Sequence, residues 1–304
     1  MPTNLTWNNV PITEGVQCIV QDGAYVVHDF MQNLLGMDPE STFEQMLALP
    51  MHPIDKEIEY APSSPFIVPG SHPSLKYRGH NLKRHKLWAQ TDTETGLVKY
   101  QYTGWQYPIA KATVDVEAVP VLSQVASKMK QGLGQGFNHL IFTLYKNGDD
   151  NIGAHHDKMK DIDIASWIVV LKLGGAARKF EFYPANGSTN EDARSKDKPI
   201  WSQVLQPGAA VFMNAHGNAM VRHGVPTEEV TGQSGSIVLR CIKTVVPWSQ
   251  VDKRATLTIE KRNKRQAEKK RKLDERAIDD DEKVLPFKKR ARFVLRPIIV
   301  AACK

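Results

Sequence analysis

The stretch FNHLIFTLYKNGDDNIGAHHD, Phe137 to Asp157, combines a strand pattern with a compact group of possible metal ligands. Its first part is rich in β-branched and aromatic residues, which favour an extended strand, and polar turn residues follow. If the last part is also extended, its side chains alternate between faces, so His155 and Asp157 point to one side and His156 to the other. The spacing therefore predicts that His155 and Asp157 can grip a metal ion together and that His156 cannot.

Further short runs of strand-forming residues follow this stretch. The runs SWIVVLKLG, KFEFYP, AAVFMN and GSIVLRCIKTVV lie between residues 166 and 246 and are divided by Gly, Asn and Pro. Several short strands in succession are typical of an antiparallel sandwich or jelly roll rather than of alternating β-α units.

Two earlier segments have the spacing of helices. In PESTFEQMLALP, residues 39–50, Ser41 and Glu44 form a capping-box pattern ahead of an apolar stripe, and EAVPVLSQVASKMKQGLG, residues 117–134, repeats apolar residues at helical spacing. We therefore expect an α+β, mainly β fold with flanking N-terminal helices.

The charge of the chain is unevenly distributed. Of the 40 Lys and Arg and the 33 Asp and Glu, residues 251–304 hold 18 and 9, which leaves 22 and 24 for the first 250 residues. The net charge of +7 thus belongs to a basic C-terminal extension with clusters at 261–272 and 288–292. Such an extension is either a solvated segment that favours solubility or a nuclear-import signal and phosphate-binding arm.

Cysteine usage and hydropathy indicate the compartment. Three scattered cysteines are too few for a disulfide framework, which favours a reducing environment. The first fifteen residues lack a basic segment followed by an apolar core, and the longest apolar runs are too short to span a membrane. We expect an intracellular protein, nuclear if the basic clusters act as an import signal, with no membrane partner and no obligate protein partner.

A third metal ligand must come from elsewhere in the chain, and His223 in NAMVRHGVP is the best candidate. It follows an expected strand and precedes Gly and Pro, which places it at the edge of a loop. Two His and one carboxylate form the facial triad of non-haem Fe(II) oxygenases, which leaves one face of the metal open. The competing histidines, on composition alone, are His28, His52, His72, His80, His85, His139 and His216.

Arg240 follows His223 by 17 residues, within the run GSIVLRCIK. Its flanking residues, Leu239 and Cys241, predict that it is buried, and a buried Arg needs an anion. One alternative is that Arg240 pairs with an acidic side chain of the sheet. We favour a dicarboxylate cosubstrate, because the planar guanidinium matches a carboxylate.

Residues 81–246 resemble the AlkB-like Fe(II)/2-oxoglutarate-dependent dioxygenases. The matching segments occur in the family's order: GLVKYQYTG, FNHLIFTLYKNGDDNIGAHHD, LGGAARKFEF and LQPGAAVFMNAHGNAMVRHGVP. The resemblance implies a double-stranded β-helix (a jelly roll) with iron held by His155, Asp157 and His223. It also implies 2-oxoglutarate and O2 as cosubstrates, with 2-oxoglutarate contacted by Tyr145 and Arg240.

The chain departs from the family pattern near the cosubstrate. The family usually has Asn two residues before the Tyr and a second Arg six residues before the strand Arg, where this chain has Thr143 and Ser234. Ser234, Ser236 and Arg240 share a strand face by parity, so we expect the hydroxyls to replace part of the missing contact. Repair-type members carry acids just after His-x-Asp, whereas this chain has Lys158, Met159 and Lys160.

Two tyrosines and a basic run suggest the substrate. Tyr100 and Tyr102 are two apart, so they can present one aromatic face to a base, and such stacking is worth about 1–3 kcal/mol per base. The alternative is ordinary sheet packing. Arg84, in LKRHK, matches a basic position of the nucleic-acid-acting relatives and could meet a phosphate. We expect nucleic acid, DNA or RNA, as the partner.

The resemblance implies an oxidoreductase that removes a methyl group from a modified, N-methylated base with release of formaldehyde, as in DNA repair. The alternatives are hydroxylation of a nucleobase or protein without demethylation, and a catalytically weak nucleic-acid-binding module on the same fold. A hydrolytic zinc site is disfavoured because no general base is arranged beside the triad. The expected divisions are an N-terminal helical or irregular segment (1–80), the dioxygenase domain (81–250) and the extension (251–304).

Overall fold

The computed structural model describes residues 4–49, 84–91, 94–100, 113–186, 198–229 and 232–250, with short pieces at 66–67, 76–77, 80–81, 264–265, 267–268 and 271. Met1–Asp252 and Lys253–Lys304 form two separate compact units. In the described part of the chain, no helix is long and apolar enough to span a membrane.

The first unit is built mainly from strands. Its helices are η1 (Met31–Leu35, a π-helical turn), α1 (Pro39–Leu47), η3 (Val116–Ala118), α3 (Pro120–Leu133) and α4 (Ala215–Met220). Its strands are β1 (Thr6–Trp7), β2 (Val10–Pro11), β3 (Val16–Val20), β4 (Ala24–Val27), β5 (Phe66–Ile67), β6 (Lys76–Tyr77), β7 (His80–Asn81), β8 (His85–Gln90), β9 (Leu97–Val98), β10 (Val114–Asp115), β11 (His139–Tyr145), β12 (Ile152–His155), β13 (Ile168–Gly175), β14 (Arg178–Pro184), β15 (Trp201–Leu205), β16 (Ala210–Met213), β17 (Val221–Val225), β18 (Ser234–Arg240) and β19 (Val245–Val246).

Two sheets dominate the described residues. The larger has the strand order β10-β8-β11-β18-β13-β16-β4-β3, with β5 also paired to β8, and the smaller has the order β12-β17-β14-β15. From β11 to β18 the chain passes between the sheets, and the pairs β11·β18, β13·β18, β13·β16, β12·β17, β14·β17 and β14·β15 are all antiparallel. This is the topology of a double-stranded β-helix, or jelly roll, so the predicted fold class is confirmed.

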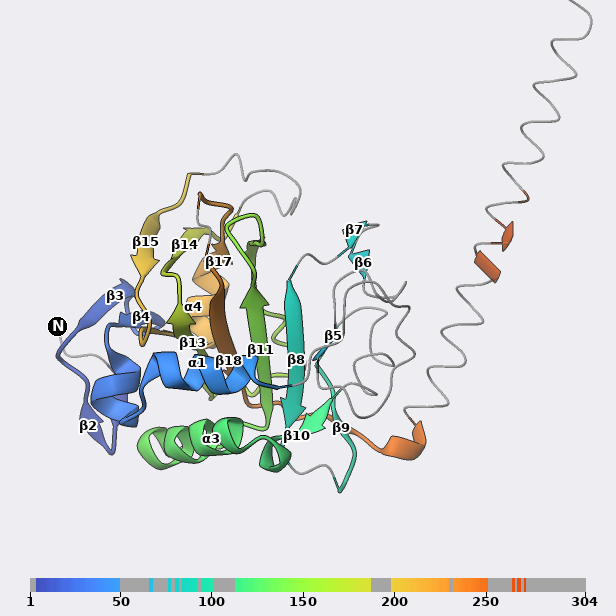
Figure 1. Cartoon of the computed structure of the whole chain (residues 1–304), viewed down its shortest axis with the longest axis horizontal. Helices are drawn as coiled ribbons and strands as arrows, with labels where there is room; N and C mark the ends of the chain where they lie inside the picture. Colours follow the sequence, from blue (N-terminus) through green and yellow to red (C-terminus); the bar gives the residue numbers. More distant parts are fainter. Residues whose placement is uncertain are drawn as a thin grey trace, which may run out of the picture. The chain divides into compact units, whose positions relative to one another are not determined.

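Helices α1 and α3 lie beside the larger sheet (Figure 1). Helix α1 is capped by Asp38, whose carboxylate accepts from the Ser41 backbone N–H at 2.6 Å, and Pro39 occupies its first turn. The predicted capping box of Ser41 and Glu44 is therefore wrong, because the helix is capped three residues earlier, at Asp38. Pro39 suits the first helical position, which explains the earlier start.

Successive residues of β18 face opposite sides of the larger sheet. Ile237 and Leu239 join the apolar core formed with α1 and α3, together with Phe142 of β11. Ser234, Ser236 and Arg240 line a cavity on the other side. The alternation of β18 thus separates a dry core from a polar cavity wall, and the predicted shared face of these three residues is confirmed.

The N-terminal segment contributes to the larger sheet as well as to the helices. Strand β4 pairs with β16, and β3 pairs with β4. Residues 1–80 were expected to be helical or irregular, so these strands were not predicted. AYVV, the sequence of β4, is four residues long and fully buried, and its pairing with β16 and β3 fixes it as a strand.

Close backbone contact fixes α4 against the β3–β4 turn, and this predicts the effect of one substitution. A Cβ at Gly217 would lie 2.1 Å from the Gly23 carbonyl oxygen, so Gly217→Ala is expected to displace α4 and destabilise the fold by about 1–3 kcal/mol. Urea unfolding measures the change. A Cβ at Gly136 meets no heavy atom within 4 Å, so Gly136→Ala is the matched control. Equal stability of the two variants would contradict this account.

Candidate metal centre

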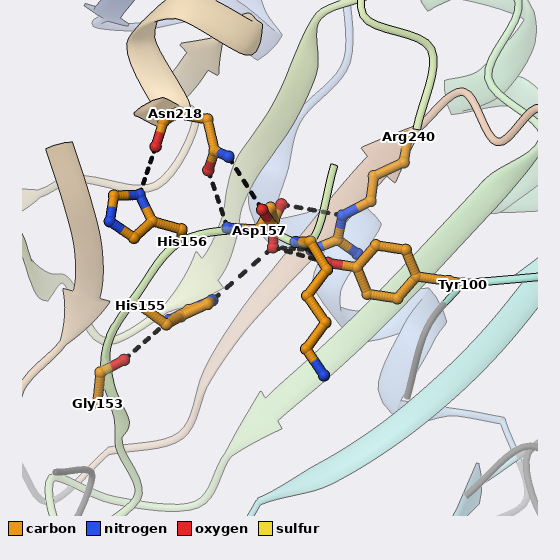
Figure 2. Close-up of polar contacts among 8 residues, drawn as sticks. Tyr100, Gly153, His155, His156, Asp157, Asn218 and Arg240 are labelled. Carbon is orange, nitrogen blue, oxygen red and sulfur yellow. Dashed lines mark hydrogen bonds and ion pairs between the residues drawn. The ribbon is translucent and has the colours of Figure 1, made fainter. Parts of the chain in front are cut away.

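Three side chains from separate segments converge at the end of β12. His155 on β12 lies opposite His223 on β17 in the strand register, and Asp157 follows two residues after His155. One ligand atom from each of these residues lies within 4.8 Å of the others. His156 points away from this group toward Asn218 (Figure 2). The structure therefore brings together the predicted triad and leaves out the adjacent histidine.

His223 differs from its expected local setting. It lies inside β17, which is paired on one side with β12 and on the other with β14, and not at the edge of a loop. Its ring stacks on Phe180 of β14, with centroids 5.9 Å apart and an interplanar angle of 9°. Strand pairing and this aromatic neighbour hold the imidazole in place before any ligand binds.

The ring nitrogens of the two histidines suit metal coordination. His155 Nδ1 lies 2.8 Å from the Gly153 carbonyl oxygen, a contact in which Nδ1 donates, so that Nε2 keeps its lone pair. Among the described residues, His223 Nδ1 is buried without a hydrogen-bond partner. A buried nitrogen without a partner beside a carboxylate is what a bound cation would satisfy, so these residues fit a metal ion.

The ionisation states also suit a metal. Burial, and then the neighbouring His155, lower the pKa of His223 to about 3. Burial likewise lowers the pKa of His155, although 32% of its side chain is exposed. Burial would raise the pKa of the Asp157 carboxyl, but Arg240, His223 and His155 together hold it below its usual range. At neutral pH the group therefore has two neutral imidazoles and one carboxylate, the forms that bind metals.

Arg240 is paired with the metal-facing carboxylate. Its Nε donates to Asp157 Oδ2 at 3.0 Å and its Nη2 to Asp157 Oδ1 at 2.9 Å, a bidentate and buried ion pair (Figure 2). The structure shows the alternative partner, an acidic side chain, and contact of Arg240 with a cosubstrate carboxylate stays a prediction. The sequence could not distinguish them, because Asp157 lies 83 residues away and meets Arg240 only in the fold.

Tyr100 contacts the same Asp157 carboxylate. Its hydroxyl donates to Asp157 Oδ1 at 3.1 Å and accepts from the Lys158 backbone N–H at 3.1 Å. Arg240 lies over one face of its ring at 4.6 Å, and the His139 ring stacks at 5.5 Å. Tyr100 is only 7% exposed but lines the cavity, and its stacking on a base stays a prediction. Tyr102 lies outside the described residues.

Asn218 on α4 holds the backbone of Asp157 and was missed by the sequence analysis. Its side-chain oxygen accepts from the Asp157 N–H at 2.8 Å, and its side-chain nitrogen donates to the Asp157 carbonyl at 3.0 Å. The backbone carbonyl of Asn218 accepts a hydrogen bond from His156 Nδ1, so His156 helps to hold α4 in place. Asn214 caps α4 through its side chain. In the sequence, Asn218 is marked only by its position four residues after this cap.

The triad opens onto a cavity of about 430 Å³ between the two sheets. All four predicted cosubstrate residues line it, namely Tyr145, Ser234, Ser236 and Arg240. Two of the predicted substrate residues, Arg84 and Tyr100, also line it. Ser236 is a side-chain hydrogen-bond partner of Tyr145. Arg84 donates through Nη1 to the Asn151 carbonyl at 2.7 Å, so part of its guanidinium is already used by the chain.

The competing histidines do not join the group in the described part of the chain. His139 lies closest in the fold, stacked on Tyr100, and burial followed by Arg240 lowers its pKa to about 3. His28, His85 and His216 are not part of the metal-binding group. His52 and His72 lie outside the described residues, and nothing is described of the His80 side chain.

Sequence comparison gives relatives with a named activity. The chain is 29% identical over 135 residues to the DNA oxidative demethylase ALKBH2 of Bos taurus and 31% identical over 112 residues to that of Mus musculus, which is 43% and 36% of this chain. It spans about half the length of these curated relatives, 46% and 44%. No protein-family model matches the chain.

Among solved structures, OsALKBH1 aligns with 74% of this chain and 99% of its own, at 11% identity and a TM-score of 0.38. An oxidoreductase of the 2OG-Fe(II) oxygenase family from Burkholderia pseudomallei aligns with 68% of this chain and 79% of its own, at 12% identity and a TM-score of 0.35. The jelly-roll topology and the His-Asp-His group agree with the sequence relatives and support the predicted resemblance. The chain resembles the AlkB-like Fe(II)/2-oxoglutarate-dependent dioxygenases.

Proposed function

We propose that this chain is an Fe(II)- and 2-oxoglutarate-dependent dioxygenase of AlkB type that oxidises an N-methylated base in nucleic acid, with loss of the methyl group as formaldehyde. The observation that carries the proposal is the buried group of His155, Asp157 and His223 on the wall of a cavity large enough for a small ligand. The names of the ALKBH2 relatives, DNA oxidative demethylases, support DNA as the substrate class.

In this proposal His155, Asp157 and His223 hold the iron from one side, which leaves its other side open to the cavity. Bound iron would supply the oxygen chemistry that attacks an unactivated C–H bond, with 2-oxoglutarate converted to succinate and carbon dioxide. Arg240 and Tyr100 fix the orientation of the Asp157 carboxylate through the three hydrogen bonds described above. The smaller sheet contributes the apolar side chains of Phe180, Leu205 and Val225 to the cavity wall.

Tyr145, Ser234 and Ser236 are proposed to contact 2-oxoglutarate. Tyr145 faces Ser234 in the register of β11 and β18, and Thr143 faces Ser236, so hydroxyl groups cluster at this part of the cavity floor. Arg240 also lines the cavity and stays a proposed contact of 2-oxoglutarate, and Asp157 engages two of its three guanidinium nitrogens.

The nucleic acid is proposed to approach the open side of the cavity, where Arg84, Lys158 and Lys179 contribute positive charge. A methylated base in a duplex would have to be extruded to reach the triad. The basic extension, residues 251–304, is proposed to add phosphate contacts and a nuclear-import signal. The divisions at 80 and 250 are kept as proposed domain boundaries.

Mass spectrometry of nucleosides tests this function. Methylated DNA and RNA are incubated with the chain, Fe(II) and 2-oxoglutarate, and then digested and quantified. Loss of an N-methylated nucleoside with equimolar formaldehyde and succinate is expected, and Asp157→Asn should remove all three changes. A gain of one oxygen with no methyl loss would favour hydroxylation, and binding of nucleic acid with no succinate would favour a binding module.

A further inference from the structure

Four neighbouring residues form a polar row across the cavity floor. The register of the larger sheet places Lys86 of β8 opposite Thr143 of β11, Thr143 opposite Ser236 of β18, and Ser236 opposite Lys172 of β13. All four line the cavity. Ser236 precedes Arg240 by four residues on β18, which is roughly 13 Å along the strand, so the row lies well away from the Arg240–Asp157 pair.

Lys172 is an unusual member of this row because it is buried. It is only 5% exposed, and its Nζ donates to the Leu173 carbonyl and, at 3.0 Å, to the Gly174 carbonyl. In the part of the chain that the structure describes, no ion pair joins Lys172 to an acidic side chain. A buried ammonium without a carboxylate partner is costly, so such a group is typical of a site that takes up an anion.

The other buried cations near the cavity already have partners. Arg240 is paired with Asp157, and Arg178 forms an ion pair with Glu228 at 3.3 Å and donates to the carbonyls of Asn147, Asp150 and Pro226. Lys172 differs from these cations because its described partners are carbonyl oxygens and not carboxylates. Its ammonium group has three protons, and two of them are donated to these carbonyl oxygens.

We propose that Lys172 binds the distal carboxylate of the 2-oxo acid, together with the hydroxyls of Tyr145 and Ser236, and so determines the preference for a dicarboxylate cosubstrate. This inference rests on the proposed function. At position 234 the chain has Ser where the family usually has Arg. Lys172 would supply the missing positive charge, because it lines the same part of the cavity from the neighbouring strand β13.

Protonation of Lys172 provides a second signature. Burial lowers its pKa to about 7, Glu40 of α1 opposes this shift, and Arg178 of β14 adds to it. The other titratable groups lining this floor are Tyr145 of β11, whose pKa is raised by burial, and Lys86 of β8. Only the charged form attracts a carboxylate, so affinity for 2-oxoglutarate is expected to be full below pH 7 and to fall above it. Arg at position 172 stays charged and should remove this dependence.

The test measures binding, not turnover, on the full chain loaded with Mn(II). Calorimetric titration compares 2-oxoglutarate with 2-oxopentanoate, which lacks the distal carboxylate. Lys172→Met is expected to weaken 2-oxoglutarate by about 30-fold or more and to change 2-oxopentanoate by less than about threefold. Lys172→Arg should restore 2-oxoglutarate binding. The matched control is Lys146→Met, which removes an exposed lysine next to Tyr145 and should not change either affinity.

Four results would overturn the assignment. If Lys172→Met binds 2-oxoglutarate as tightly as the wild type does, or loses both ligands equally, Lys172 does not bind the distal carboxylate. Loss of the dicarboxylate preference in Lys86→Met but not in Lys172→Met would move the contact to the other end of the row. A folded, Mn(II)-loaded wild type that binds neither 2-oxo acid would instead overturn the proposed function, and the Lys172 assignment with it.

Discussion

Replacement of Arg240 by Leu is expected to destabilise the fold by about 3–5 kcal/mol, because it leaves the Asp157 carboxylate buried without its compensating charge. The guanidinium makes both of the close ionic contacts to this carboxylate, and Asp157 is only 4% exposed. Urea unfolding of the metal-free chain measures the loss. Arg240→Lys keeps the charge but not the bidentate geometry, so an intermediate loss is expected.

A double substitution separates this effect from a packing defect. Asp157→Asn combined with Arg240→Leu leaves no buried charge without a partner, so the double variant should recover most of the lost stability. If Arg240→Leu alone is as stable as the wild type but raises the KM for 2-oxoglutarate, Arg240 holds the cosubstrate and the pairing with Asp157 is not its main role.

Replacement of His155 by Ala is expected to lower turnover by more than about 100-fold, while His156→Ala retains most of the activity. Loss of an outer partner of a metal ligand typically costs about 10–100-fold in affinity or activity, and loss of a ligand itself should exceed this. His156 instead contacts the carbonyls of Asn218 and Ala185, so its loss should reduce stability more than chemistry. Succinate release under saturating Fe(II) and 2-oxoglutarate measures both variants.

The two histidine variants are matched because they remove the same side chain from adjacent positions. Circular dichroism of each variant shows whether it is folded before turnover is compared. Equal loss in the two variants would mean that strand alternation does not decide which histidine acts, and the choice of His155 would be wrong.

Local sequence patterns predicted the elements whose residues carry their own signal. The runs that became β11, β13, β14, β16 and β18 are rich in β-branched and aromatic residues and are bounded by turn residues. Helix α3 lies within the segment whose apolar residues recur at helical spacing. Strand alternation alone also chose His155 over His156, because a period of two is a property of any extended chain.

Contacts between distant segments could not be read in the same way. Arg240 in a buried strand signals a need for an anion, but the sequence does not say whether that anion is Asp157 or a ligand. The hydrogen bond between Tyr100 and Asp157 likewise depends on the packing of residues that lie 57 positions apart in the chain. Parity predicted that Tyr100 faces one side of a strand and could not predict that Arg240 and His139 cover its ring.

Two polar residues escaped notice because nothing local marks them. Asn218 lies in a short helix, and its two hydrogen bonds to the Asp157 backbone reveal its role. Lys172 lies inside the run IVVLKLGG, where a single Lys suggests a side chain that reaches solvent. The register with β18 shows instead that it faces the cavity.

The central claim is that His155, Asp157 and His223 together hold one metal ion. Anaerobic calorimetric titration of Fe(II) into the wild type should give one ion per chain, and His155→Ala and His223→Ala should each abolish this binding, whereas His156→Ala should preserve it. A wild type that takes up no iron while folded, or a His223→Ala variant that binds iron as tightly as the wild type does, would contradict the claim.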